Sequence, residues 1–350
     1  MWLNENLQPT DWDGAFPELD FEAAASRIGE VVPPTPLVPL PGSIPGVFDL
    51  RGKMENRQVT GSFKARGALN NMLRLTEEER ALGVVASSSG NHGRALAWAA
   101  RRVGVAAAVV MPEDAYPNKI EACRAEEAEV VLAPDRWQAD VVAERMAGEG
   151  RLWVHPYDRP GTVEGAGTVG LELAADWPEV EVVVVCIGGG GLSAGSALAL
   201  RRSLGAGVVI LGAEPVGAAA MVAAQRAGRS VHLDTITSQV QGLTTTYAGH
   251  LNVEVCRATL DGIITVDDEA ILAAQRRLVN PEEAAGWSGE VVEPAGAAAY
   301  AAALSDDLCE LVTAARERRG LSTEPCGAMG VAVTISGGNP APDQLEAQRT

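Results

Sequence analysis

Positive charge is scarce in this chain of 350 residues. Lysine and arginine together number 28 against 46 acidic residues, which gives a formal net charge of −18. Lysine occurs only as Lys53, Lys64 and Lys119. A protein that binds a nucleic-acid backbone needs a basic face. The composition therefore argues against a nucleic-acid partner and is typical of a solvated acidic surface.

Paired cysteines and long apolar runs are missing as well. The cysteines show no paired spacing, which argues against a disulfide framework and for a reducing compartment: they are Cys123, Cys186, Cys256, Cys309 and Cys326. The apolar run Val182–Ile187 is far too short to cross a membrane. The polar, acidic start Met1–Asn6 is unlike a signal peptide. We therefore expect a cytoplasmic protein without a membrane partner.

Short apolar segments alternate with helical patterns along most of the chain. A helix is expected at Phe21–Ile28, followed by an extended Pro-rich passage. The later strands are expected at Gly83–Ser87, Ala106–Met111, Glu129–Leu132, Leu152–His155, Glu181–Ile187 and Val208–Ala213. The later helices are expected at Asn91–Val103, Asn118–Glu127, Arg136–Gly148 and Leu192–Ser203. This alternation predicts two parallel-sheet α/β domains, a small one at 83–158 and a large one from 1–82 plus 159–350.

A run of glycine follows the apolar segment Val182–Ile187: Gly188, Gly189, Gly190 and Gly191. Backbone N–H groups in such a loop converge on an anion, and the dipole of the following helix adds to the attraction. A dinucleotide loop is an alternative, but the G-x-G-x-x-G spacing is met only loosely because Ser193 stands at the third glycine. A tight turn that binds no ligand is a further alternative for this glycine run.

Lys64 lies in the run Thr60–Gly67, next to Phe63 and several small residues. Desolvation beside apolar groups lowers the pKa of an amine and makes it nucleophilic. An exposed surface lysine is the alternative interpretation. A lysine that can form a Schiff base, together with a phosphate-binding glycine loop, describes a site for pyridoxal phosphate (PLP).

Two polar loops add to the predicted pyridoxal phosphate site. Ser88, Ser89 and Asn91, in a loop that leads from a strand into a helix, suit a carboxylate, although a serine there is often an ordinary helix cap. His92 alone would more often be structural than catalytic. Ser336 follows the last expected strand, where its hydroxyl is placed to donate a hydrogen bond to a ring nitrogen.

Six segments in this order resemble the fold-type II PLP enzymes, whose fold is that of the tryptophan synthase β subunit. Within them the resemblance is to the serine/threonine dehydratase and serine racemase group, and it extends from about Pro33 to Asn339. The segments are Lys53–Gly67, Ser88–Gly93, His155–Asp158, Gly188–Leu192, Val292–Gly296 and Ser336–Asn339.

The resemblance implies a role for each candidate residue. It makes Lys64 the Schiff-base lysine, which also moves the Cα proton. It implies that PLP is held by a further set: Phe63 beside the ring, Asn91 at the 3′-oxygen, Ser336 at the ring nitrogen, and Gly188, Gly189, Gly190, Gly191 and Leu192 at the phosphate. It implies that the substrate carboxylate is surrounded by Ser88, Ser89, Asn91 and His92.

The implied reaction is ammonia elimination from a β-hydroxy-α-amino acid such as threonine or serine, catalysed by a homodimer. A neutral serine at the ring nitrogen makes PLP a weaker electron sink than an aspartate does, which favours loss of a β-leaving group. A racemase is an alternative, with Ser89 as the second acid–base group. β-Replacement, a threonine synthase-like reaction, a dinucleotide-dependent oxidoreductase and a PLP-binding protein without catalysis also stay open.

Several departures from the family pattern bear on the substrate and on metal binding. Metal-binding members carry a second carboxylate where this chain has Ala220, so Glu214 alone predicts no metal site. Gln241 replaces a usual aspartate, and Thr244–His250 is unusual for a threonine dehydratase. The segment Ser305–Ser322 lengthens the stretch before the last strand. Little sequence follows Asn339, so we expect no C-terminal regulatory domain.

Overall fold

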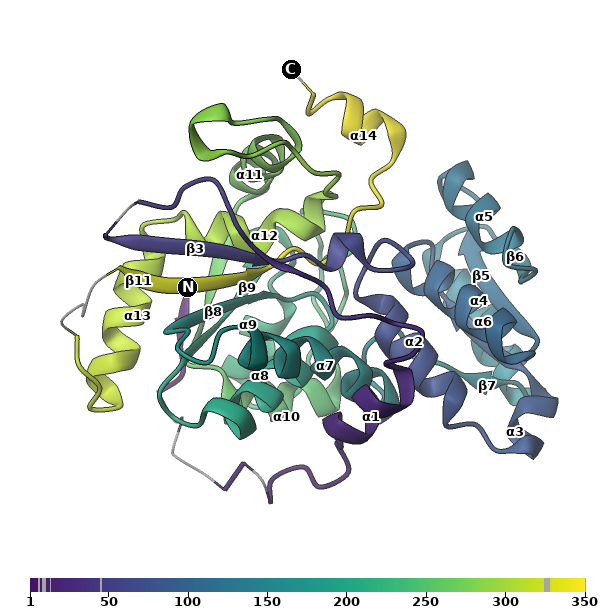
Figure 1. Ribbon diagram of the computed structural model, residues 1–350. Helices are drawn as coiled ribbons and strands as arrows, with labels where there is room; N and C mark the ends of the chain where they lie inside the picture. Colours follow the sequence, from purple (N-terminus) through teal and green to yellow (C-terminus); the bar gives the residue numbers. More distant parts are fainter. Residues whose placement is uncertain (6, 8–10, 13, 45, 324–327, 350) are drawn as a thin grey trace.

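Two separate β-sheets organise the molecule (Figure 1). The computed structural model describes all residues except 6, 8–10, 13, 45, 324–327 and 350. Within the described residues, one sheet has seven strands in the order β1-β10-β9-β8-β11-β3-β2 and the other has four in the order β6-β5-β4-β7. The predicted parallel α/β architecture is confirmed.

The larger sheet is parallel except at its two edges, where β1 runs antiparallel to β10 and β2 antiparallel to β3. Its strands are β1 (Trp2–Leu3), β2 (Leu37–Pro39), β3 (Phe48–Lys53), β8 (Val182–Cys186), β9 (Val209–Pro215), β10 (Gly262–Val266) and β11 (Met329–Thr334). The strand β8 is buried throughout. A parallel sheet covered on both faces requires such an uninterrupted apolar strand.

The smaller sheet is wholly parallel. Its strands are β4 (Val84–Ser87), β5 (Ala107–Pro112), β6 (Glu129–Ala133) and β7 (Leu152–Trp153). Helices α4 (Asn91–Val103), α5 (Pro117–Arg124) and α6 (Arg136–Gly148) lie beside it, on the right of Figure 1. Helices α4 and α6 have the bounds that the sequence predicted.

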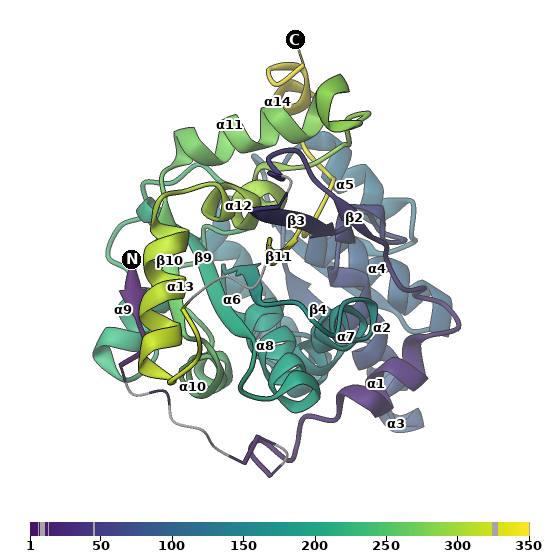
Figure 2. The ribbon, with the colours of Figure 1, turned by 60° about the vertical axis from the view of Figure 1, so that its left-hand side comes forward.

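The remaining helices surround the larger sheet or connect the two sheets (Figure 2). They are α1 (Phe21–Ile28), α2 (Lys64–Leu73), α3 (Glu77–Leu82), α7 (Pro160–Asp176), α8 (Gly191–Leu204), α9 (Ala220–Ala227), α10 (His250–Thr259), α11 (Asp268–Val279), α12 (Pro294–Ala303), α13 (Asp307–Arg318) and α14 (Pro342–Glu346). The helix α2 contacts both α4 and α7, so it lies between the two sheets. Most of the segment Ser305–Ser322 forms α13.

Two predicted elements end at least two residues earlier than expected. The helix expected to reach Glu127 stops at Arg124, because Glu127 has a positive φ of 61° and Ala128 N–H returns to the carbonyl of Cys123. The strand expected to reach His155 stops at Trp153. The imidazole Nδ1 of His155 instead accepts the backbone N–H of Asp158 at 2.9 Å and so holds a turn.

Close packing of α7 against α8 fixes where α8 begins. A Cβ at Gly195 would lie 2.3 Å from the carbonyl oxygen of Val163, and a Cβ at Gly170 would lie 2.4 Å from that of Ser196. Only glycine allows the two backbones to approach this closely. The start of α8, where the glycine run lies, is therefore held by the core.

No helix of the described chain is long and apolar enough to cross a membrane. The cysteines that the structure describes are all free: Cys123, Cys186, Cys256 and Cys309. Cys326 lies outside the described residues. The described residues contain no group of three or more histidine, cysteine, aspartate and glutamate side chains placed to hold a metal ion.

Candidate active site

Lys64 is the first residue of α2, and it is half-buried. Its Nζ donates a hydrogen bond to the carbonyl of Pro156 at 2.7 Å and lies 4.9 Å from the centre of the Phe63 ring. Burial lowers the pKa of this amine to about 8, from a usual 10.5. A larger share of the amine is then neutral near neutral pH, as a nucleophile requires.

Arg66, two residues beyond Lys64, anchors the start of α2. Its guanidinium forms paired hydrogen bonds with the carboxylates of Glu55 and Glu172, at 2.5–2.9 Å. The arginine is only 1% exposed. Such a paired geometry fixes direction as well as distance. The helix, and Lys64 with it, is therefore held in one position relative to α7.

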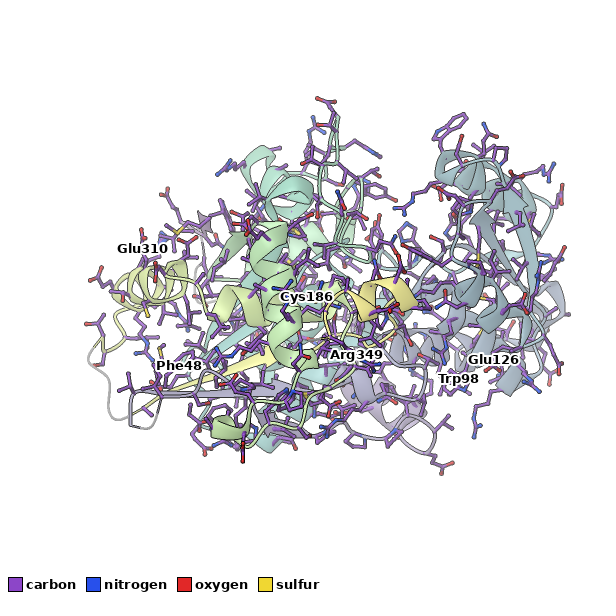
Figure 3. The ribbon with its side chains drawn as sticks, turned by 90° about the horizontal axis from the view of Figure 1, so that it is seen from above. Phe48, Trp98, Glu126, Cys186, Glu310 and Arg349 are labelled. Atoms are coloured by element: carbon purple, nitrogen blue, oxygen red, sulfur yellow. The ribbon has the colours of Figure 1, made fainter. Side chains whose placement is uncertain are left out.

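The glycine run lies between β8 and α8 and leaves no room for side chains. A Cβ at Gly189 would lie 2.2 Å from Cγ of Tyr157, and one at Gly190 would lie 2.7 Å from Cε of Met221. Gly190 also has a φ of 94°, which disfavours any other residue. Cys186, the last residue of β8, lies in the middle of the molecule (Figure 3), so the loop begins there.

Backbone N–H groups of the glycine loop have no hydrogen-bond acceptor among the described residues. Among the described residues, none accepts a hydrogen bond from the backbone N–H of Gly188, Gly189 or Gly190. The carbonyl of Gly189 accepts hydrogen bonds from Asn252 Nδ2 at 2.8 Å and from Gly249 N at 3.0 Å. Because C=O and N–H point in opposite directions in a trans peptide, this anchor turns the N–H of Gly190 away from α10, toward the loop's open side.

Aromatic rings border this loop. The ring of Tyr157 packs on Gly189 and meets the His155 ring edge-on at 4.6 Å and the Tyr247 ring at 5.7 Å. Burial lowers the pKa of His155 to about 4, so this imidazole is neutral at pH 7. Its Nδ1 accepts a backbone N–H, so Nε2 carries the proton and donates to the Tyr247 hydroxyl at 3.0 Å.

The predicted carboxylate loop begins α4. Ser88 Oγ accepts the backbone N–H groups of Gly90 and Gly93, at 3.3 and 3.1 Å, so its hydroxyl supports the helix start. The imidazole Nε2 of His92 bonds the carbonyl of Val154 at 2.9 Å. Burial lowers the pKa of His92 to about 3, so the ring is neutral and structural. Ser89 is half-buried, and within the described chain its hydroxyl bonds to nothing.

Asn91 is held from two sides. Its Nδ2 donates to Glu293 Oε1 at 2.5 Å, and its Oδ1 accepts Asn339 Nδ2 at 2.8 Å. Burial raises the pKa of Glu293, against the attraction of Lys119 and the hydrogen bond from Asn91. A cavity of about 330 Å³ opens beside Asn91, between α4, α5 and the segment that follows β11.

Ser336 and Phe63 lie on neighbouring segments. The backbone N–H of Phe63 donates to the carbonyl of Ser336 at 3.2 Å, and Ser62 pairs with Gly337 in an isolated bridge. The Ser336 side chain is buried, and its Oγ makes a long 3.4 Å contact with the carbonyl of Ala295. The structure therefore brings the segment of Lys64 and the segment of Ser336 together, as the resemblance implies.

Glu214 caps a helix. Its carboxylate accepts the backbone N–H groups of Met221 and Val222 at 2.7 and 3.0 Å, at the start of α9. Burial raises the pKa of this carboxyl to about 8, while the two N–H groups oppose the shift. Ala220 is the first residue of the same helix. Both carboxylate oxygens are thus engaged by the protein itself.

The residues present fit a phosphorylated aldehyde cofactor. The glycine loop offers free N–H groups at a helix N-terminus, which is a site for phosphate. Lys64 is half-buried, its amine is desolvated, and it has no ion-pair partner among the described residues. Ser62 Oγ and Thr245 Oγ1 are buried without a hydrogen-bond partner in the described structure. These groups are suited to a polar ligand that lies between Lys64 and the loop.

The fold is a parallel α/β architecture, and its candidate site combines a desolvated lysine with a glycine loop of the kind that holds a phosphate. The family model of the pyridoxal-phosphate dependent enzymes matches residues 28–316. The chain belongs to this family, and it is a PLP-dependent enzyme. The expected cofactor is confirmed.

Known relatives share the sequence over most of the chain. The L-threonine ammonia-lyase of Thermotoga maritima is 38% identical over 255 residues, which are 72% of this chain and 62% of that protein. The phenylserine dehydratase of Ralstonia pickettii is 36% identical over 286 residues, 81% of this chain and 84% of that protein. The chain therefore spans less than two thirds of the first relative and most of the second.

Solved structures share the fold. Maize serine racemase superposes with a TM-score of 0.82 and 32% identity, over 93% of this chain and 94% of that one. The chain therefore has the fold of the fold-type II PLP enzymes, as predicted.

Sequence reasoning overlooked several residues that the structure places at the site. Tyr157, Glu293 and Asn339 lie inside motifs that supported the resemblance, but no role was assigned to them. The pairing of His155 with Tyr247 joins residues 92 positions apart. Asn252 lies 63 positions from the glycine whose carbonyl it binds, and nothing in the local sequence of α10 indicates this contact.

Proposed function

We propose that this protein is a PLP-dependent ammonia-lyase that acts on a β-hydroxy-α-amino acid. The observation that carries the proposal is the half-buried Lys64, whose amine has a pKa lowered by desolvation and lies near a glycine loop whose N–H groups have no acceptor among the described residues. Relatives that act as L-threonine ammonia-lyase and phenylserine dehydratase support this reaction class. The proposed substrates are threonine, serine and bulkier β-hydroxy amino acids.

PLP supplies an aldehyde that holds the substrate's amino group and a ring that withdraws electrons from Cα. Lys64 Nζ takes the Cα proton in this proposal, because its lowered pKa makes a larger share of it neutral near pH 8. Phe63 would pack beside the ring, and Leu192 and the four glycines would hold the phosphate. The neutral hydroxyl of Ser336 would bond the ring nitrogen, which would favour loss of the β-hydroxyl.

The start of α4 is the proposed site for the substrate carboxylate. Ser88 and His92 already bond the protein through their side chains, so they contribute the shape of the loop. The free hydroxyl of Ser89 and the backbone N–H groups of the loop remain for the carboxylate. The one uncommitted N–H of Asn91 is proposed to bond the 3′-oxygen of PLP. A helix N-terminus favours a negative charge there.

The aromatic rings of Tyr157 and Tyr247 are the proposed boundary for the substrate side chain. They exclude water from the reacting atoms and offer apolar faces to a methyl or phenyl group. Selectivity between substrates that differ by a methylene is expected to be only about 10–200-fold.

Racemisation is the second candidate function. It requires an acid–base group on the face of Cα opposite Lys64. Ser89 is half-buried and has an uncommitted hydroxyl among the described residues, which favours this candidate. Maize serine racemase is a structural relative. In this case D-serine appears from L-serine, and Ser89→Ala abolishes that product while keto-acid release continues.

The proposal also covers the oligomeric state, the cellular compartment and the domain boundaries. We infer a homodimer in the cytoplasm, with the domains at 83–158 and at 1–82 plus 159–350. The location of all four strands of the smaller sheet between Val84 and Trp153 supports these boundaries. Light scattering on the purified protein measures the oligomeric state, and a monomeric mass contradicts the dimer.

The test of the proposed function is release of α-keto acid from L-threonine, L-serine and phenylserine by the PLP-loaded protein. We expect release from at least one of them, with ammonia in equal amount. Lys64→Ala removes this activity, and a small primary amine added to that variant restores part of it. No keto acid from any of the three, with PLP bound at Lys64, contradicts the lyase.

A further inference from the structure

The side chain of Asn339 connects three parts of the molecule. Its Nδ2 donates to the carbonyl of Thr60 at 2.9 Å and to Asn91 Oδ1 at 2.8 Å. Its Oδ1 accepts a hydrogen bond from Arg94 Nη1 at 2.7 Å. Thr60 lies just before Lys64, and Arg94 and Asn91 lie in the first turn of α4. The one carboxamide therefore contacts the lysine segment, the carboxylate loop and the segment after β11.

The partners of Asn339 determine which way its carboxamide faces. A guanidinium only donates hydrogen bonds, and a backbone carbonyl only accepts them. Oδ1 must therefore face Arg94, and Nδ2 must face Thr60. In the reversed orientation the amide NH₂ would face the guanidinium and two oxygens would face each other. The orientation thus follows from the hydrogen-bonding chemistry of the neighbours.

This orientation is passed on to Asn91. Because Asn339 offers Nδ2 there, Asn91 must present its Oδ1 in return. Asn91 Nδ2 then lies on the other side, where Glu293 Oε1 accepts one of its two hydrogens. An ionised carboxylate only accepts hydrogen bonds, so Glu293 favours the same orientation of Asn91 as Asn339 does. The oxygen of Asn91 is occupied, and the remaining N–H is the group that it can offer to a ligand.

We propose that Asn339 is a positioning residue that, together with Arg94 and the Thr60 carbonyl, makes Asn91 present N–H rather than C=O to the 3′-oxygen of PLP. The inference rests on the proposed function, in which Asn91 bonds that oxygen. An N–H donor stabilises the ionised 3′-oxygen, whereas a carbonyl would repel it. The ionised form of the cofactor absorbs at longer wavelength than the neutral form, so the orientation of Asn91 is visible in the spectrum.

The test is the absorbance spectrum of the PLP-loaded protein at one fixed pH, for wild type and Asn339→Leu. Leucine has a similar size and adds no charge, but it cannot bond to Asn91. The forms with an ionised and a neutral 3′-oxygen differ only in the position of one proton, so the ratio of their bands reports directly on the hydrogen bond to that oxygen. We expect the ratio of the visible band to the near-ultraviolet band to fall by about tenfold, as the loss of one hydrogen bond to a charged group predicts. We also expect the PLP affinity of Asn339→Leu, measured by fluorescence titration, to be lower than that of wild type.

Variants of Arg94 separate orientation from charge. Arg94→Lys keeps a partner that only donates, so we expect a spectrum close to wild type. Arg94→Met removes that partner and shifts the ratio of the two bands in the same direction as Asn339→Leu. Lys119→Met removes a positive charge that also bonds Asn339, but at the backbone carbonyl of Asn339, so it shifts the band ratio less. Arg102→Gln, at the exposed far end of α4, leaves the spectrum unchanged.

The outcomes are distinct. If PLP-loaded wild type releases no keto acid, the proposed function itself is contradicted. If wild type releases keto acid but shows no visible band, or if folded, PLP-bound Asn339→Leu keeps the wild-type band ratio, only the role of Asn339 is contradicted. If Asn339→Leu does not fold, equal shifts in Arg94→Met and Lys119→Met contradict the role, and a larger shift in Arg94→Met supports it.

Discussion

At the scale of single residues, the three lysines show what separates a reactive amine from a structural one. Lys53 is fully buried, but its Nζ lies 2.8 Å from carboxylate oxygens of both Glu172 and Asp176. Lys119, on α5, bonds the backbone carbonyl of Asn339, and burial lowers its pKa as it does that of Lys64, so only its distance from the Lys64 segment in the sequence separates the two. Lys64 has no carboxylate within ion-pair distance in the described chain. Burial without a counter-charge lowers the pKa of an amine, whereas a paired charge keeps it protonated.

The first prediction concerns the pH dependence of cofactor attachment. In the PLP-free protein the neutral form of Lys64 reacts with the aldehyde, and its pKa is about 8 instead of 10.5. The rate of Schiff-base formation, followed by absorbance, should therefore rise with pH and level off above about pH 8. A rate that keeps rising toward pH 10.5 would mean that the amine is not desolvated.

The second prediction concerns Gly189. A Cβ there would overlap the Tyr157 ring, so Gly189→Ala must displace the ring or the loop. We expect PLP affinity to fall about tenfold or more, which corresponds to roughly 1.4 kcal/mol, as measured by fluorescence titration. Gly148→Ala, at the end of α6 with nothing within 4 Å of the added Cβ, is the matched control. Equal PLP affinities of the two variants would show that the glycine loop tolerates a side chain at position 189.

At the scale of elements, the sequence predicts the features that depend on signals within one segment, such as where a helix begins or ends. The bounds of α4 and α6 follow from signals within each segment: Gly104 ends α4 in a left-handed conformation, and Asp135 caps α6. The signal for β8, an apolar run followed by glycine, also lies within one segment. The buried pairing of Arg66 with Glu172 joins residues 106 positions apart, and no pattern in α2 or α7 alone indicates it.

The third prediction concerns this anchor of α2. Arg66→Met leaves the carboxylates of Glu55 and Glu172 without their main partner in a buried place, which costs about 3–5 kcal/mol in the free energy of unfolding. Chemical denaturation measures it. Arg124→Met removes an exposed pair with Glu121 and should cost less than about 1 kcal/mol. A loss as small in Arg66→Met as in this control would mean that the buried pairs contribute little.

At the scale of the whole molecule, the site collects residues from segments that are far apart in the sequence. Lys64 begins α2 and the glycine loop begins α8, whereas Asn91 follows a strand of the smaller sheet. The alternation of strands and helices predicts that such loops meet at the carboxyl ends of parallel strands. It does not predict that the Tyr157 ring covers Gly189, because that contact depends on the packing of both sheets.

The fourth prediction follows from this arrangement. A cofactor bound between elements of both sheets stabilises the whole fold by mass action, by about 2.7 kcal/mol at a hundredfold excess over its Kd. We expect PLP to raise the Tm of wild type, and to raise that of Lys64→Ala much less. An equal rise in both proteins would indicate that binding does not involve Lys64.

The most direct measurement reduces the PLP-loaded protein with borohydride, digests it and locates the phosphopyridoxyl group by mass spectrometry. The account predicts one label per chain, on the peptide that contains Lys64, with Lys53 and Lys119 unlabelled. A label on either of those lysines, or no label on a protein that still releases keto acid, would contradict the assignment of Lys64 as the cofactor's anchor.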